Sequence, residues 1–246
     1  MPRFYLPASL RLDQVFELTD SAARHLQVLR LQPGDFVTLF NGGFVGSSPV
    51  GGEFIARIDR MGRREVQLTV QSHQAIERES HREIHLALAV PANDRMDWLV
   101  EKATELGVSS IQPLFTQRSV VRMDADRATK KIAHWQSIAI AACEQCGRNQ
   151  VPPVHPVLSL ADWMVRRHHG HHFLLSLSHE SISLPVLLKT IDHQPLFLLS
   201  GPEGGFSPDE ELAACSAGFS RISLGPRVLR ADTAPLAALS ALTLSS

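Results

Sequence analysis

The feature that most constrains the fold is a regular alternation of strand-like and helical patterns over the last two thirds of the chain. Apolar runs typical of buried strands occupy residues 84–90, 111–115, 172–177, 195–200 and 220–224. Helical patterns follow them at residues 94–106, 126–146, 184–191, 208–217 and after Asp232. Strands that alternate with helices indicate a largely parallel sheet covered by helices. The sequence therefore predicts an α/β domain over residues 84–246.

The first 72 residues follow a different pattern. Short β-type runs at residues 4–6, 14–18, 35–40, 52–58 and 65–72 are separated by turn sequences rich in glycine. One amphipathic helix is predicted between them, at residues 21–30. This pattern predicts a small β-barrel over residues 1–72. Residues 73–83 are polar and charged without apolar periodicity, so we expect a linker there.

Composition narrows the class of protein. A chain of 246 residues that is 44% hydrophobic can bury a sizeable core. Its apolar runs are shorter than the ~18 residues of a membrane span, the N-terminal residues lack the apolar core of a signal peptide, and three cysteines are too few for a disulfide framework. We expect a cytoplasmic protein without a membrane partner. With a formal net charge of -1, binding to a nucleic acid would depend on a local basic patch.

The loop GPEGGFS, residues 201–207, follows the apolar strand at 195–200 and opens a helix. Ser207 and Glu210 form a capping-box pattern, with Pro208 at the first helical position. The glycines of this loop permit close approach of the backbone to a ligand, or a tight turn that needs positive φ. Both interpretations remain open from the pattern alone. The loop matches neither the dinucleotide fingerprint nor a P-loop, which disfavours a nucleotide-dependent oxidoreductase.

A second loop, LGPRVLRADTA at residues 224–234, places Arg227 and Arg230 before the N-terminus of the last helix. A cation is disfavoured there by the helix dipole, so a negative group should compensate it. Asp232 is the expected N-cap, with Pro235 in the first turn, and Asp232 could itself pair with an arginine. An anionic ligand is the alternative.

Two patterns that invite a metal do not support one. Cys143 and Cys146 lie inside a predicted helix and only Cys215 remains, so a four-thiolate zinc site is impossible. Adjacent histidines at 168, 169, 171 and 172 point in different directions and lack a carboxylate signature. We expect no metal.

The two loops resemble the motifs of the RsmE-type 16S ribosomal RNA (uridine-N3) methyltransferases of the SPOUT superfamily. Further segments similar to that family occur in the same order, namely RHLQVLRLQPGD (24–35), DRMDWLVEKATELGV (94–108), QRSVV (117–121) and ACEQCGR (142–148). Ala92 and Asn93 replace an expected Lys-Gly pair, and ADTA replaces a more usual Thr-Glu-Thr-Ala.

This resemblance implies an N-terminal PUA-like β-barrel that binds RNA and a C-terminal SPOUT-type α/β domain with a deep trefoil knot around S-adenosylmethionine. It also implies a homodimer and methylation of N3 of a uridine in 16S rRNA of the small ribosomal subunit. A noncatalytic RNA-binding or ribosome-assembly factor with the same fold is the alternative.

Candidate site residues follow from the chemistry and from the matched motifs. Methylation at N3 removes a proton and leaves negative charge on the uracil carbonyl oxygens, which a fixed cation stabilises. Arg230 is our candidate for that cation, and Glu203, Asp232 and water are candidate proton acceptors. The expected cofactor-binding residues are Leu175, Leu177, Leu199, Ser200, Gly201, Gly204, Gly205, Leu224, Gly225 and Leu229, the leucines being also plausible core residues. The expected RNA-binding residues are Arg24, Arg30, Arg95, Arg118 and Arg148.

Overall fold

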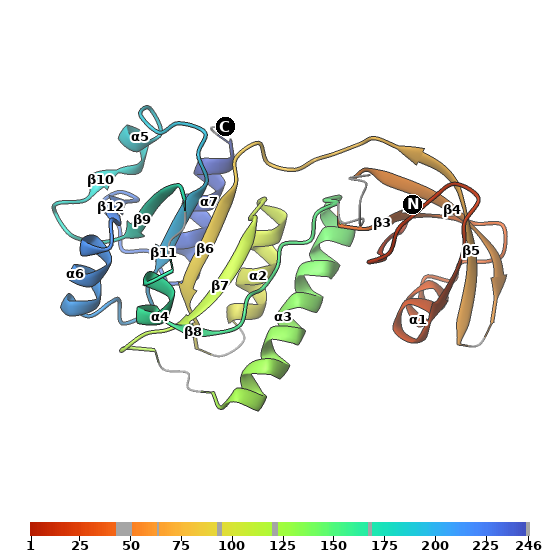
Figure 1. The fold of residues 1–246 in the computed structure, drawn as a ribbon, viewed down its shortest axis with the longest axis horizontal. Helices are drawn as coiled ribbons and strands as arrows, with labels where there is room; N and C mark the ends of the chain where they lie inside the picture. Colours follow the sequence, from red (N-terminus) through yellow and green to blue (C-terminus); the bar gives the residue numbers. More distant parts are fainter. Residues whose placement is uncertain (43–50, 63, 93–94, 120–122, 167–168, 245–246) are drawn as a thin grey trace. The chain divides into compact units, whose positions relative to one another are not determined.

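The computed structural model describes residues 1–42, 51–62, 64–92, 95–119, 123–166 and 169–244. The chain folds as two compact units. Met1–Glu79 and Cys143–Val151 form the first, and Ser80–Ala142 and Pro152–Ser246 form the second. Each of the two units is described separately below (Figure 1).

The first unit is built on a five-stranded sheet with the strand order β1-β3-β4-β5-β2. Its elements are β1 (Arg3–Tyr5), β2 (Val15–Thr19), α1 (Asp20–Val28), β3 (Phe36–Phe40), β4 (Glu53–Met61) and β5 (Glu65–Gln74). β1 is parallel to β3, and the other pairs are antiparallel. β5 alternates buried and half-buried residues as far as Val70, as expected for a sheet with one face in the core. The predicted small β domain is confirmed, with β5 running two residues into the expected linker.

Helix α1 packs on this sheet through Ala23 and Leu26, which are fully buried. The chain leaves the helix in a Schellman turn, in which the Leu31 amide donates to the Leu26 carbonyl oxygen at 3.3 Å and the Arg30 amide donates to Gln27 at 2.9 Å. Arg30 occupies the left-handed position of this turn, with φ 57°, where glycine is usual. The helix thus ends on a strained, exposed arginine.

The second unit contains a seven-stranded sheet with the order β10-β12-β9-β11-β6-β7-β8, in which every pair is parallel. Its strands are β6 (Ile84–Ala89), β7 (Ser110–Phe115), β8 (Leu158–Ser159), β9 (His171–Leu175), β10 (Ile182–Ser183), β11 (Leu196–Ser200) and β12 (Ser220–Ser223). Its helices are α2 (Arg95–Glu105), α3 (Ala125–Cys146), α4 (Leu160–Met164), α5 (Leu184–Leu187), α6 (Pro208–Ser216) and α7 (Thr233–Leu244), with the last residues of α3 belonging to the first unit. The predicted α/β class is confirmed.

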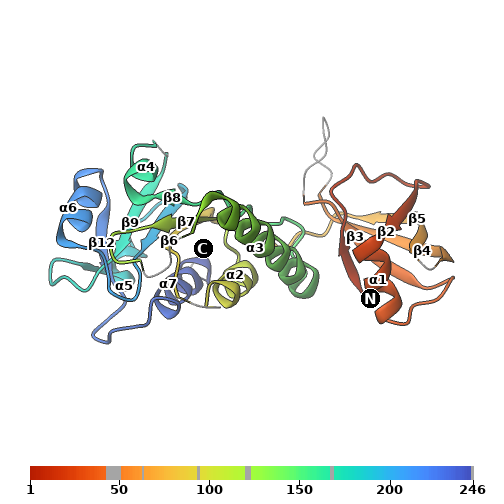
Figure 2. The same ribbon diagram turned by 90° about the horizontal axis from the view of Figure 1, so that it is seen from below.

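The central strand β11 is buried along its whole length, which explains why its sequence is continuously apolar rather than alternating. In Figure 2, α4 and α6 lie on one side of the sheet, and α2 and α7 lie on the other. Trp163 of α4 and Ala214 of α6 share a core cluster with Phe197 and Leu199 of β11. Both faces of the sheet are therefore covered. The trefoil knot stays a prediction from the family resemblance.

Three short elements did not show in the sequence pattern. β8 and β10 have two residues each, too few for an alternation, and α4 has five, too few for a helical period. A cap does mark the start of α4, because the Ser159 hydroxyl accepts from the Asp162 amide. That signal is too common to identify a helix by itself.

The cysteine pair of the predicted CxxC lies in the last turn of α3. Cys143 is buried, and burial raises the pKa of its thiol to about 12. Within the described ranges, no group of three or more histidine, cysteine, aspartate or glutamate side chains is placed to hold a metal. Asn93 and His168 lie outside those ranges. None of the described helices is long and apolar enough to cross a membrane.

Candidate functional site

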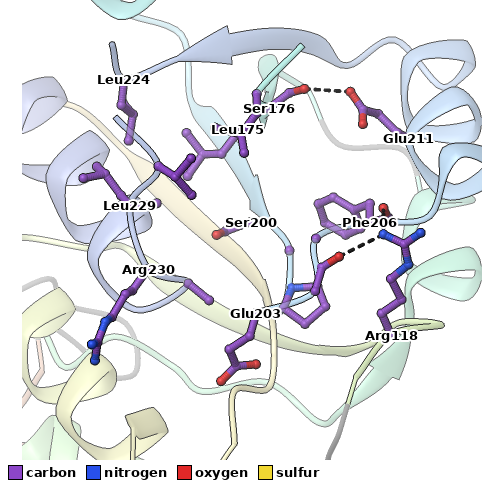
Figure 3. Close-up of a pocket in the computed structure, with 18 of the residues that line it drawn as sticks. Arg118, Leu175, Ser176, Ser200, Glu203, Phe206, Glu211, Leu224, Leu229 and Arg230 are labelled. Carbon is purple, nitrogen blue, oxygen red and sulfur yellow. Dashed lines mark hydrogen bonds between the residues drawn. The ribbon is translucent and has the colours of Figure 1, made fainter. Parts of the chain in front are cut away.

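A pocket of about 530 Å³ lies in the second unit, where β9, β11 and β12 end. Leu175 ends β9, Ser200 ends β11, and Leu224 follows β12. The carboxyl ends of parallel strands are the usual place for ligands in α/β sheets, because the loops that follow the strands meet there. Both loops singled out in the sequence contribute to this pocket (Figure 3).

The Gly-rich loop, defined here as residues 201–206, forms one wall. The Gly205 amide donates to the Pro202 carbonyl oxygen at 2.8 Å, and Gly205 has φ 66°, which requires glycine or a strained residue. The predicted capping box is present. The Ser207 hydroxyl accepts from the Glu210 amide, and the Glu210 carboxylate accepts from the Ser207 amide. α6 therefore starts at a fixed point directly behind the loop.

The loop at residues 224–234 forms the opposite wall. Helix α7 begins at Thr233, directly after Asp232, and the N-cap role of Asp232 stays a prediction. The carbonyl oxygen of Arg230 accepts from the amides of Thr233 and Ala234, at 3.0 and 2.9 Å. These bonds fix the Arg230 backbone to the start of the helix, while its side chain is exposed and lines the pocket.

Apolar side chains form the interior of the pocket between these walls. Leu175, Leu224 and Leu229 lie close together in Figure 3, and Ile222 and Val228 also line the cavity. A polar group lies at the end of β9, where the Ser176 hydroxyl donates to Glu211 at 2.7 Å. The Arg221 guanidinium donates to the same Glu211 oxygen at 2.7 Å. The pocket thus combines an apolar interior with a few placed polar groups, as ligand sites usually do.

Charged residues surround the mouth of this pocket. Arg95, Arg118, Arg227 and Arg230 line it, with Glu203 and Glu211 as the acidic residues. The Glu203 carboxylate accepts from the Ala92 amide at 3.1 Å and from Arg95 at 3.4 Å. The excess of arginine favours a ligand that is negatively charged at this edge.

The structure brings most of the predicted site residues together. The pocket is lined by Leu175, Leu177, Ser200, Gly201, Glu203, Gly204, Gly205, Leu224, Gly225, Leu229 and Arg230, together with Arg95 and Arg118. Leu199 is fully buried in the core of the sheet instead, and Asp232 is not among the lining residues.

The remaining predicted RNA-binding arginines lie in the first unit. Arg24 and Arg30 are exposed on α1 and on the turn that follows it. Arg148 is buried, with a side chain 7% exposed, and it donates to the Glu79 carboxylate at 2.8 Å from Nε. Its Nη2 atom lies 2.7 Å from the same oxygen. Arg148 is thus engaged in a buried ion pair.

Sequence reasoning missed Ser176, Phe206 and Glu211 as pocket residues. Phe206 lies within the loop that was recognised for its glycines. Its apolar side chain in that loop was the signal that could have identified it as a pocket residue. Ser176 and Glu211 are 35 residues apart and meet only because β9 and α6 are neighbours. No local pattern identifies such a pair.

Comparisons with known proteins agree with this architecture. A family model for an RNA methyltransferase domain matches residues 78–243, and one for an RNA methyltransferase PUA domain matches residues 18–71. The fold and site thus define a two-domain RNA methyltransferase.

Individual relatives define the family within the RNA methyltransferases. Ribosomal RNA small subunit methyltransferase E from Buchnera aphidicola is 30% identical over 98% of this chain and 95% of its own length. The crystal structure of a protein of the same name from Neisseria gonorrhoeae, bound to S-adenosylmethionine, superposes with a TM-score of 0.87 at 38% identity, covering 98% of this chain and 96% of the other. A methyltransferase from Legionella pneumophila in complex with S-adenosylmethionine superposes with a TM-score of 0.89 at 37% identity, covering 99% and 97%. The chain belongs to the ribosomal RNA small subunit methyltransferase E family, as its motifs indicated.

Proposed function

We propose that this protein transfers a methyl group from S-adenosylmethionine to N3 of a uridine in 16S rRNA. The observation that carries the proposal is the convergence of the loops after β9, β11 and β12 on one pocket that Arg230 lines. Two similar proteins bind S-adenosylmethionine. A volume of about 530 Å³ and a mainly apolar interior also suit a ligand of that size.

The residues of the pocket fit this cofactor. The apolar side chains of Leu175, Leu224 and Leu229 offer surfaces for a neutral ring, and the Gly-rich loop offers backbone groups that no side chain covers. The half-buried carboxylate of Glu211 lines the pocket and accepts hydrogen bonds, so it suits hydroxyl or ammonium donors. When bound, the cofactor supplies an electrophilic methyl group on a sulfonium.

The protein's own contribution concerns the uracil. N3 must lose its proton before it forms the bond to the methyl carbon, and the negative charge then spreads onto the two carbonyl oxygens. The cationic guanidinium of Arg230 belongs to a residue whose backbone is held at the start of α7, so it stabilises that negative charge in place. The proton goes to a carboxylate or to water. Glu203 lines the pocket, and Asp232 lies two residues after Arg230.

The RNA itself should contact the first unit as well. Arg24 and Arg30 are exposed there and suit phosphate contacts, and the PUA model covers both of them. We propose that the protein acts as a homodimer in the cytoplasm, on the assembled small ribosomal subunit. Sedimentation of the protein would test the homodimer. A comparison of methylation of free RNA with methylation of small subunits would test the substrate.

Methyl transfer can be measured with labelled S-adenosylmethionine and small subunits that lack the modification, followed by mapping of the methylated nucleotide. We expect Arg230→Ala to lower the rate by about 10²-fold or more while cofactor binding persists, because one charge-stabilising group is lost. Arg230→Lys is the matched control that keeps the charge. Full activity of Arg230→Ala would remove the role assigned to this residue. Binding of the cofactor without transfer by the unmodified protein would instead favour the noncatalytic assembly factor.

A further inference from the structure

The Gly-rich loop is held by an arginine of another loop, Arg118, which also lines the pocket. Nη1 of Arg118, which follows β7, donates to the carbonyl oxygens of Gly204 and Phe206, at 2.9 and 3.1 Å (Figure 3). The stem of this side chain packs on the loop too. A Cβ placed at Gly204 would lie 3.5 Å from the Arg118 Cβ. One side chain thus fixes two of the six residues of the loop.

The turn that carries Arg118 is itself tied down. The Thr116 amide donates to the Ser119 hydroxyl at 3.0 Å, and the Ser119 amide donates to the Thr116 carbonyl oxygen at 3.1 Å. The Gln117 amide donates to Oε1 of Glu210 at 2.7 Å, while Oε2 of that carboxylate accepts from the Ser207 amide at 2.9 Å. The capping glutamate of α6 therefore joins the Arg118 turn to the end of the Gly-rich loop.

The segment that follows β6 holds the other side of the Gly-rich loop. Oε1 of Glu203, in that loop, accepts from the amide of Ala92 at 3.1 Å and from the guanidinium of Arg95 at 3.4 Å. The segments that follow β6 and β7 thus both form hydrogen bonds with the Gly-rich loop, which follows β11.

We propose that Arg118 and Glu203 are positioning residues that hold the Gly-rich loop in its ligand-binding form, rather than an RNA contact and a proton acceptor. This inference rests on the proposed function, since it concerns the loop that would meet the cofactor. A loop with three glycines loses much conformational freedom when it is ordered. Contacts that order it before binding remove that cost from the binding step. Both hydrogen bonds come from Nη1 of Arg118, so they fix the direction of the guanidinium relative to the loop.

Arg118→Ala separates the two roles. Calorimetry should show S-adenosylmethionine bound roughly tenfold more weakly, the loss expected from two charge-assisted hydrogen bonds in a half-open site. Affinity for small subunits at constant salt should stay within about twofold, because no phosphate contact is lost. Arg118→Lys, which keeps the charge and part of the stem, should recover part of the cofactor affinity. The matched control is Arg127→Ala, which removes an exposed arginine of α3 outside the pocket. Unchanged cofactor affinity with weaker RNA binding would overturn the inference.

Hydrogen exchange without ligand tests the positioning role of Arg118 independently of the proposed function. The amides of Gly201 and of residues 203–206 should exchange faster in Arg118→Ala than in the unmodified protein without any ligand, since the loop is then less restrained. Equal exchange would sink the positioning role even if the protein binds no S-adenosylmethionine. Failure of the unmodified protein to bind that cofactor would instead refute the proposed function.

Glu203 is tested by kinetics. Glu203→Ala should raise the KM for S-adenosylmethionine more than it lowers kcat, and it should leave the pH dependence of kcat in place. Glu203→Gln keeps a carbonyl oxygen that can accept from Ala92, so it should recover part of the affinity. A loss of the pH dependence of kcat in Glu203→Gln, with an unchanged KM, would identify Glu203 as the proton acceptor.

Discussion

The buried ion pair of Arg148 indicates a structural role for this residue, in place of the RNA contact that its motif predicted. Its guanidinium donates from Nε to Oε2 of Glu79, and its Nη2 atom lies 2.7 Å from the same oxygen. Oε1 of Glu79 accepts from the amides of Asn149 and Gln150, at 2.9 and 3.0 Å. The side chains of the pair are only 7% and 15% exposed, so water screens them little. Glu79 thus anchors residues 148–150 in the first unit.

Arg148→Ala removes the cation and leaves the Glu79 carboxylate buried with two amide donors. Breaking a buried pair on one side costs roughly 3–5 kcal/mol. Because the two amides remain, we expect the lower end, about 3 kcal/mol. The measurement is urea unfolding followed by circular dichroism, with hydrogen exchange of the β3 and β4 amides to locate the loss in the first unit. Arg57→Ala is the control. It breaks an exposed pair with Asp59 and should cost less than about 1 kcal/mol.

If Arg148→Ala unfolds within about 1 kcal/mol of the unmodified protein, the pair does not stabilise the unit as a buried one should. A simultaneous drop in affinity for the small subunit would then assign Arg148 to the RNA.

Two further predictions concern the same unit. Burial raises the pKa of Glu144, although the Tyr5 amide donates to it at 3.0 Å, so its stabilising effect is present below the unfolded pKa and lost as pH rises through the folded one. Glu144→Gln, which keeps the acceptor, should therefore gain stability relative to the unmodified protein as the pH rises above about 4, the pKa of an unfolded glutamate. A difference in urea midpoints that does not change with pH would contradict this. Arg30→Gly should stabilise the fold by roughly 1 kcal/mol, because glycine adopts φ 57° without strain, yet weaken RNA binding. A destabilised Arg30→Gly protein in the same urea assay would show that the turn does not strain the arginine.

The sequence predicted those parts of the fold that depend on local pattern. β11 is apolar at every position because both of its faces are buried, and α6 starts where its capping box is written. Both loops of the pocket were also recognised from local sequence, the first from its glycines and the second from the arginines that precede the last helix. The strands β8 and β10, of two residues each, and the five-residue helix α4 were missed, because they are too short to show a period.

The α/β class, the family and the two loops that meet at the pocket all follow from the amino-acid sequence alone. The use of the charged side chains depends instead on the tertiary structure. Arg118 turns to the carbonyl oxygens of Gly204 and Phe206, Arg148 is buried against Glu79, and Arg230 stays exposed at the pocket. Each of these three arginines lies in a motif that resembles the family, and the neighbouring residues do not distinguish their roles. Its partner comes from a distant part of the chain, so its role depends on packing that no short segment encodes.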